Sequence, residues 1–225
     1  MKRHRWVVLG LAATALTLFV PQAQAKKSSG PAGTYDEGRL VASWFSQEPL
    51  TFVEADEIDY LWVREGFDVA GKSFQFKSWP APVYLGEDAE DRDQDDKDLA
   101  KQLNSNIVEL LVREWGEAWA GKGAKTSTSS GDIVVEGRIV DCSTGSAAAK
   151  FWVGMGAGAG STVVDLKFTE KGSGRLVAAM HHRIVSGTNW STTDSKFKKW
   201  IRKVGDEIAD EGLGKLYEKG DRVKK

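Results

Sequence analysis

The stretch LAKQLNSNIVELLVREWGEAW at residues 99–119 predicts the most clearly defined element of this chain, an amphipathic helix. Its apolar residues recur every three or four positions, which places them on one helical face: Leu99, Leu103, Ile107, Leu110, Leu111, Trp115, Ala118 and Trp119. Gly121 and Gly123 end the pattern. A helix with one apolar face has to cover another surface, and the flanking segments supply one.

Those flanking segments alternate between apolar and polar residues, as β-strands do. Two such runs lie within residues 57–79, and three more lie at residues 132–142, 161–170 and 175–186. A second amphipathic helix is expected at residues 193–219. The order predicts an α+β fold. It is a two-layer sandwich in which a mainly antiparallel sheet of about four or five strands is covered on one face by two amphipathic helices.

Residues 1–25 have the layout of a secretory signal peptide. A basic start is followed by an apolar run at residues 6–20 and by Ala23-Gln24-Ala25, a pattern that signal peptidase recognises. A membrane anchor is the alternative, but the run is shorter than the roughly 20 residues that span a bilayer. We therefore expect cleavage near Ala25, a flexible tether at residues 26–34, one domain at residues 35–220 and a periplasmic or secreted location. No transmembrane helix is expected in the mature chain.

The charge composition argues against nucleic acid as a partner. The net charge of −1 gives no overall field that would attract nucleic acid. The 41% of hydrophobic residues are enough for a folded core. The single cysteine, Cys142, cannot form an internal disulfide, so it is either a buried thiol or a partner in an intermolecular one.

A catalytic or metal site is not expected. His181 and His182 are adjacent on a predicted strand, so their side chains point to opposite faces and cannot share one metal ion. A nucleophile pair of Cys142 with either histidine is formally open, but no local feature activates the thiol. We therefore assign no catalytic residue, no metal ligand and no cofactor.

The acidic segment at residues 87–98 resembles a calcium-binding loop only in part. Asp91, Asp93 and Asp95 have the required spacing. However, Asp96 occupies the glycine position and Gln102 the position of the bidentate glutamate. A solvated loop that leads into the helix is the better interpretation.

Small residues and tryptophans suggest a contact surface for a partner. Glycines alternate with small residues at positions 154–160, and a strand rather than a helix follows them, which argues against a phosphate loop. Two tryptophans lie in polar turns, where exposure is expected. The residues expected at a partner contact are Trp79, Trp152, Gly154, Gly156, Gly158 and Trp190.

The start of the last predicted helix is basic. The cluster of basic side chains there could contact anionic lipid head groups at a membrane surface. Alternatively, it could be a solvated helix face with ion pairs such as Lys203–Glu207. The basic residues are Lys196, Lys198, Lys199, Arg202 and Lys203.

Several segments resemble a bacterial envelope family known as domain of unknown function 4410. They lie at residues 60–63, 135–141, 150–158, 165–174 and 181–188, and Phe-Trp-Val-Gly-Met-Gly-Ala-Gly at residues 151–158 is the most specific of them. The resemblance covers roughly residues 57–216. It implies a small α/β sandwich without an established enzyme activity or any catalytic residue to carry over.

The sequence thus favours an exported, non-enzymatic protein of the cell envelope that binds a protein partner, as an accessory in an interaction or assembly. A binder of a small ligand or glycan is the alternative, with Trp79 and Trp190 as stacking surfaces. A hydrolase that uses Cys142 or the acids near Asp91 is a third hypothesis.

Overall fold

The computed structural model describes residues 38–55, 58–86, 89–145 and 160–185, together with residues 199 and 201. Its elements are α1 (Ala42–Phe45), β1 (Val53–Ala55), β2 (Ile58–Val63), β3 (Ser73–Phe76), the 3-10 turn η1 (Ala89–Asp91), α2 (Gln94–Trp119), the 3-10 turn η2 (Ala120–Lys122), β4 (Lys125–Ser127), β5 (Ile133–Ser143), β6 (Ser161–Glu170) and β7 (Leu176–Val185). These strands form one seven-stranded sheet in the order β1-β2-β7-β6-β5-β3-β4. The α+β class is confirmed, but the sheet is larger than predicted.

The sheet is mixed, although antiparallel pairs predominate. β3 runs parallel to both β4 and β5, whereas the pairs β1–β2, β2–β7, β5–β6 and β6–β7 are antiparallel. The parallel pairing follows from α2, because a helix that crosses the sheet between two strands returns the chain in its original direction. β1 and β4 were not expected as strands, since three residues each are too few to reveal alternation.

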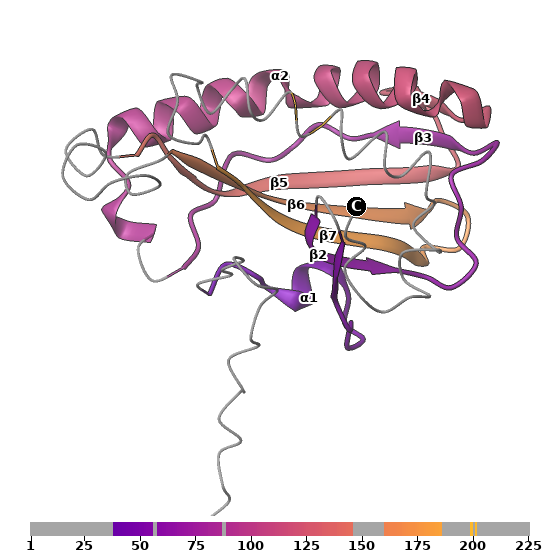
Figure 1. The fold of residues 1–225 in the computed structure, drawn as a ribbon, viewed down its shortest axis with the longest axis horizontal. Coiled ribbons are helices and arrows are strands. Elements are labelled where there is room, and N and C mark those ends of the chain that lie inside the picture. Colours follow the sequence, from indigo (N-terminus) through magenta and orange to yellow (C-terminus); the bar gives the residue numbers. More distant parts are fainter. Residues whose placement is uncertain are drawn as a thin grey trace, which may run out of the picture.

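α2 covers one face of the sheet along its length (Figure 1). The side chain of Asp93 caps its start by accepting a hydrogen bond from the Asp96 backbone N at 3.0 Å, and such a cap stabilises a helix by about 1 kcal/mol. Trp115 and Trp119 are fully buried on its inner face. Their rings pack against Phe74, Phe76 and Phe168 of the sheet. The predicted apolar face is therefore the face that builds the core.

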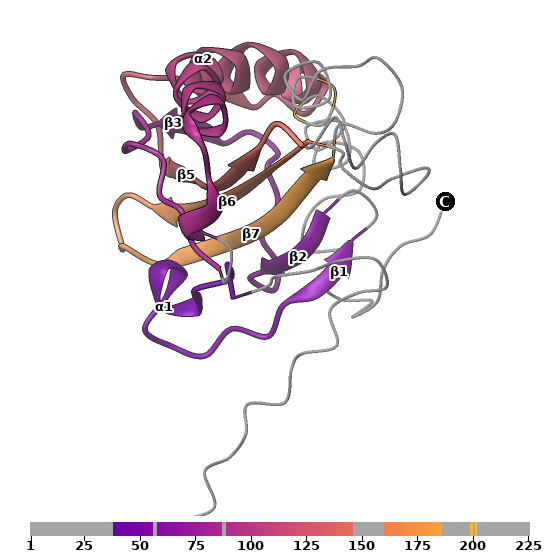
Figure 2. The same cartoon turned by 90° about the vertical axis from the view of Figure 1, so that its left-hand side faces the viewer.

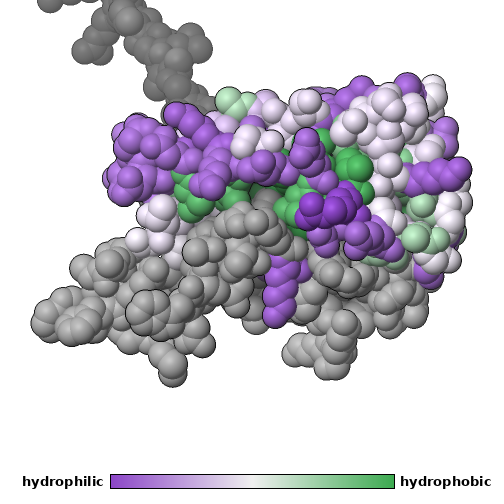
Figure 3. Space-filling model, turned by 90° about the horizontal axis from the view of Figure 1, so that it is seen from above, coloured by the Kyte–Doolittle hydropathy of each residue, from purple (hydrophilic) through white to green (hydrophobic). Residues whose placement is uncertain are grey.

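The second predicted helix, at residues 193–219, lies outside the described residues except for Lys199 and Ile201. Both of these are helical, Lys199 exposed and Ile201 fully buried. The indole N–H of Trp115 donates to the Ile201 carbonyl at 2.5 Å. Seen from the α2 side, some hydrophobic residues are visible between polar ones (Figure 3). Because Ile201 is buried and hydrogen-bonded to Trp115, it belongs to the hydrophobic core beside α2.

The opposite face of the sheet is covered as well, which corrects the expectation of a sheet covered on one face. α1 and the segment that follows it in the sequence lie on the side of the sheet away from α2 (Figure 2). The first six residues of β6 are consequently all buried, including those that alternate away from α2. One of these is Asp165, and a buried carboxylate requires partners.

The proposed signal peptide and tether, residues 1–34, lie outside the described residues. In the part of the chain that is described, no helix has the length and apolar character needed to cross a membrane.

Candidate functional site

A row of buried polar side chains crosses the sheet on the face away from α2. The strand register places Arg138, Asp165, His181 and Tyr60 side by side on β5, β6, β7 and β2. The Asp165 Oδ2 accepts from Arg138 Nε at 2.8 Å, and its Oδ1 lies 2.6 Å from His181 Nδ1. His181 packs edge-on against Tyr60. Because a register shift would separate these groups, the row specifies how four strands pair.

Trp44 of α1 covers this row from outside. The guanidinium carbon of Arg138 lies 4.4 Å from the Trp44 ring centroid, and the ammonium of Lys167 lies 4.7 Å from the same ring. Both distances fall within the range of cation–π attraction. Phe45, the next residue, is buried against Phe52. The short helix α1 is therefore held on the sheet by aromatic and cationic side chains.

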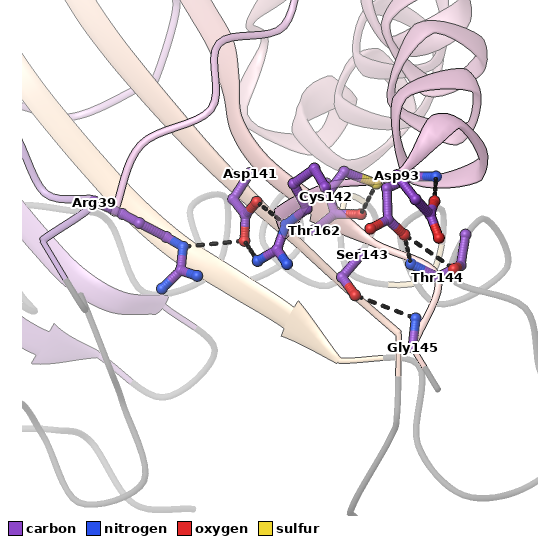
Figure 4. A network of polar contacts seen from close by, with 10 residues as sticks. Arg39, Asp93, Asp141, Cys142, Ser143, Thr144, Gly145 and Thr162 are labelled. Carbon is purple, nitrogen blue, oxygen red and sulfur yellow. Dashed lines mark hydrogen bonds and ion pairs between the residues drawn. The ribbon is translucent and has the colours of Figure 1, made fainter. Parts of the chain in front are cut away.

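Asp141 is the centre of a second buried charge cluster (Figure 4). Its Oδ2 accepts from Arg39 Nε at 3.0 Å, and both of its oxygens accept from Arg92, at 2.7 and 2.8 Å. The side chains of Asp141 and Arg39 are 2% and 3% exposed. Arg39 precedes α1 and Arg92 precedes α2, so one carboxylate of β5 fixes two distant segments.

Cys142 is a buried thiol, as one of the two sequence hypotheses expected. Its Sγ lies 3.6 Å from Thr162 Oγ1, and burial raises the pKa of the thiol to about 11. His181 points to the other face of the sheet. His182 shares the face of Cys142, but its Nδ1 lies 2.8 Å from a carboxylate oxygen of Asp59. The thiol is therefore protonated at neutral pH, and its polar contact is Thr162 rather than a base.

Trp79 is buried rather than exposed, which corrects the expectation of a contact residue in a polar turn. Its side chain belongs to the core and is 8% exposed. It lies against Gly137 of β5, where an added Cβ would come within 2.3 Å of the indole ring. The absence of a side chain at Gly137 creates the space for the ring, and this pairing of distant residues leaves no signal in the local sequence.

The acidic segment, which was expected to be a solvated loop, includes the first turn of α2, because the helix begins at Gln94 and Asp96 is buried in it. Asp93 caps the helix, and Asp96 accepts from the Thr144 backbone N at 2.6 Å and from its hydroxyl at 2.9 Å. Within the described ranges, no group of three His, Cys, Asp or Glu side chains is placed to hold a metal ion.

Several residues expected at a contact surface lie outside the described part of the chain: Trp152, Gly154, Gly156, Gly158, Trp190, Lys196, Lys198, Arg202 and Lys203. Of the basic cluster, Lys199 is described and exposed. Gly160, which ends the glycine-rich run, is buried directly before β6, so a strand does follow this run.

An open pocket of about 490 Å³ lies beside α1, where β6 ends and β7 begins. Its charged lining residues are Glu48, Arg64, Glu136, Lys167 and Arg175. These residues come from separate strands and loops, and no motif in the sequence singled them out. The size falls within the range of ligand-binding clefts, about 300–1,000 Å³.

Two of the three pocket cations are paired with acids. Lys167 Nζ lies 3.5 Å from Glu136 Oε2, and Arg175 Nη2 lies 2.8 Å from Glu170 Oε2. The pKa of Glu170 is held below its ordinary value mainly by the hydrogen bond from the Ser173 hydroxyl and, to a smaller extent, by Arg175. Arg64 differs from both, because its Nε donates to a carbonyl, that of Leu176, at 2.8 Å.

Comparisons with known proteins give one family match and remote structural likenesses. The family model "Domain of unknown function (DUF4410)" matches residues 54–188. The PelC dodecamer from Paraburkholderia phytofirmans is 12% identical, with a TM-score of 0.43, over 65% of this chain and 94% of that chain. A DUF330 protein from Xanthomonas campestris is 10% identical, with a TM-score of 0.37, over 76% and 96% of the two chains. A search of curated proteins gave no match.

Proposed function

The chain belongs to the DUF4410 family, and from this premise we propose that it is an exported, non-enzymatic protein of the bacterial cell envelope that works by binding a protein partner. The proposal takes export from the signal-like residues 1–25. It takes binding from the structure, and the open pocket beside α1 is the observation that carries it.

The chemistry of the buried groups supports a non-enzymatic role. Asp165 and His181 are at most 1% exposed and contact each other. Cys142 is fully buried, and its pKa of about 11 keeps the reactive thiolate scarce at neutral pH. Burial therefore argues against a hydrolase that uses Cys142 as its nucleophile. In contrast, the pocket presents charged side chains of both signs at the surface, a pattern suited to polar contacts with another protein.

The alternative of a glycan binder loses one of its two stacking surfaces, because Trp79 is buried. Trp190, the other surface, lies outside the described residues. Among the groups that the structure describes, the pocket therefore favours a protein partner.

Site-specific photocrosslinking tests this proposal. A photoreactive residue replaces Gln47, which lines the pocket, or Lys101, whose side chain is 69% exposed on α2. The variants are irradiated in cells of the bacterium that produces the protein. We expect a discrete crosslinked protein at position 47 and none at position 101. The proposal fails if position 47 gives no adduct, or if both positions give the same adducts.

A further inference from the structure

Arg64 is held in place within the pocket by two contacts. Its Nε donates to the Leu176 carbonyl at 2.8 Å, and its guanidinium carbon lies 5.5 Å from the centroid of the Trp62 ring. The two contacts fix the plane of the guanidinium without using its terminal nitrogens for a carboxylate. An arginine oriented in this way loses little conformational freedom when it binds a ligand.

Of the three cationic side chains that line the pocket, Arg64 is the one that forms no ion pair with an acid of the described residues. Lys167 is compensated by Glu136, and Arg175 is compensated by Glu170. Within the described residues, Arg64 has no carboxylate partner. One positive charge is thus available to a ligand at this position.

The charges of the pocket determine which kind of anion Arg64 can bind. The planar guanidinium fork fits both carboxylates and phosphates. The lining also contains Glu48, however, and its carboxylate would repel a second negative charge. A monoanion is therefore preferred over a phosphate dianion or a polymer of acidic sugars. The carboxylate of Glu48 can accept hydrogen bonds from the partner, either from its amide N–H groups or from its cationic side chains near the bound carboxylate.

We infer that Arg64 binds a single carboxylate of a protein partner, which is an aspartate or glutamate side chain or a chain end. This inference rests on the proposed binding function of the same pocket and names the chemistry that the pocket recognises. Arg64 is its specificity-determining residue, while Lys167 and Arg175 maintain the shape of the pocket through their internal ion pairs.

The test is a titration followed by NMR on the isotopically labelled protein. The probes are acetyl-Gly-Glu-Gly-amide and the matched acetyl-Gly-Gln-Gly-amide, which differ only in the carboxylate. We expect the Glu peptide to bind at least about tenfold more tightly, with shifts centred on Arg64 and Leu176, since one charge-assisted hydrogen bond accounts for a factor of that order. Equal affinities for the two peptides would overturn the inference, and this comparison needs no variant.

Two variants locate the effect. R64Q should abolish the preference for the Glu peptide, and R64K should retain only part of it, because lysine provides charge without the fork. R113Q, which removes an exposed arginine of α2, should leave the preference unchanged. A preference that survives in R64Q would overturn the inference, as would tighter binding of trigalacturonate than of the Glu peptide. A partner crosslinked at position 47 without any carboxylate preference would sink this inference alone and leave the proposed function standing.

Discussion

Gly137→Ala is the substitution that tests most sharply how Trp79 is buried. The added Cβ would lie 2.3 Å from the indole Cε2 and Cζ2 and 2.7 Å from Nε1. Carbon atoms in contact are normally separated by about 3.5–4.0 Å, so the ring or the strand has to move by more than roughly 1 Å. Overpacking of this kind costs about 1–3 kcal/mol.

A smaller effect opposes this cost, because glycine within a strand is less stable than alanine by about 0.5–1 kcal/mol. The net expectation is a loss of about 1–2 kcal/mol in the free energy of unfolding. For a domain of this size, the melting temperature would fall by roughly 2–8 °C. Denaturant titration and thermal melting followed by circular dichroism measure both quantities.

The control is Gly172→Ala in the turn between β6 and β7, where an added Cβ meets no atom within 4 Å. This variant should melt close to the unmodified protein. In a Trp79→Leu background the clash is removed, so Gly137→Ala should become neutral or slightly stabilising. If Gly137→Ala destabilises the protein equally in both backgrounds, or not at all, Trp79 does not lie over Gly137.

Three further predictions concern buried ionisable groups. Because the folded-state pKa of Cys142 is raised to about 11, alkylation of the native protein at pH 8 should be about a hundredfold slower than that of the unfolded chain; equal rates would contradict its burial. The thiol's contribution to stability is complete below about pH 9 and is lost as the pH rises toward about 11, so Cys142→Ala should flatten the alkaline fall in melting temperature. Asp141→Asn leaves Arg39 and Arg92 without their shared carboxylate and should cost about 3 kcal/mol in denaturant unfolding. The exposed Asp98→Asn should cost at most about 1 kcal/mol, and similar losses in the two variants would refute the buried cluster.

The sequence predicted those parts of the fold whose signals are local. The strands β2, β3, β5, β6 and β7 and the apolar part of α2 appear where periodicity placed them, because each buries at least one continuous face, although α2 begins earlier than expected, at Gln94. β4 is different: its polar residues Lys125–Ser127 gain their pairing from β3 and from α2, where Thr126 donates to the Val112 carbonyl. Such a strand exists only in its tertiary context.

The buried charges could be anticipated only in part. Asp165 interrupts the apolar run of β6, and a carboxylate in such a position indicates a buried partner. Its partners Arg138 and His181 become identifiable only once the register of three strands is known. Arg39 lies far from Asp141 in the chain and in a segment without clear periodicity, so the second cluster had no local signal.

The pocket was missed for the same reason. Arg64, Lys167 and Arg175 are ordinary surface residues in the sequence, and only the packing of α1 beside β6 and β7 brings them together. The site expected from glycine and tryptophan content was a compositional inference, and the one described tryptophan of that set, Trp79, is part of the core.

The proposed role requires that the protein reaches the cell envelope and loses its leader there. The most direct measurement is the intact mass of the protein recovered from fractionated cells of the bacterium that produces it. The account predicts a chain in the envelope or secreted fraction that begins at Lys26, the residue after Ala25. A full-length chain that retains residues 1–25 and stays in the cytoplasmic fraction would contradict it.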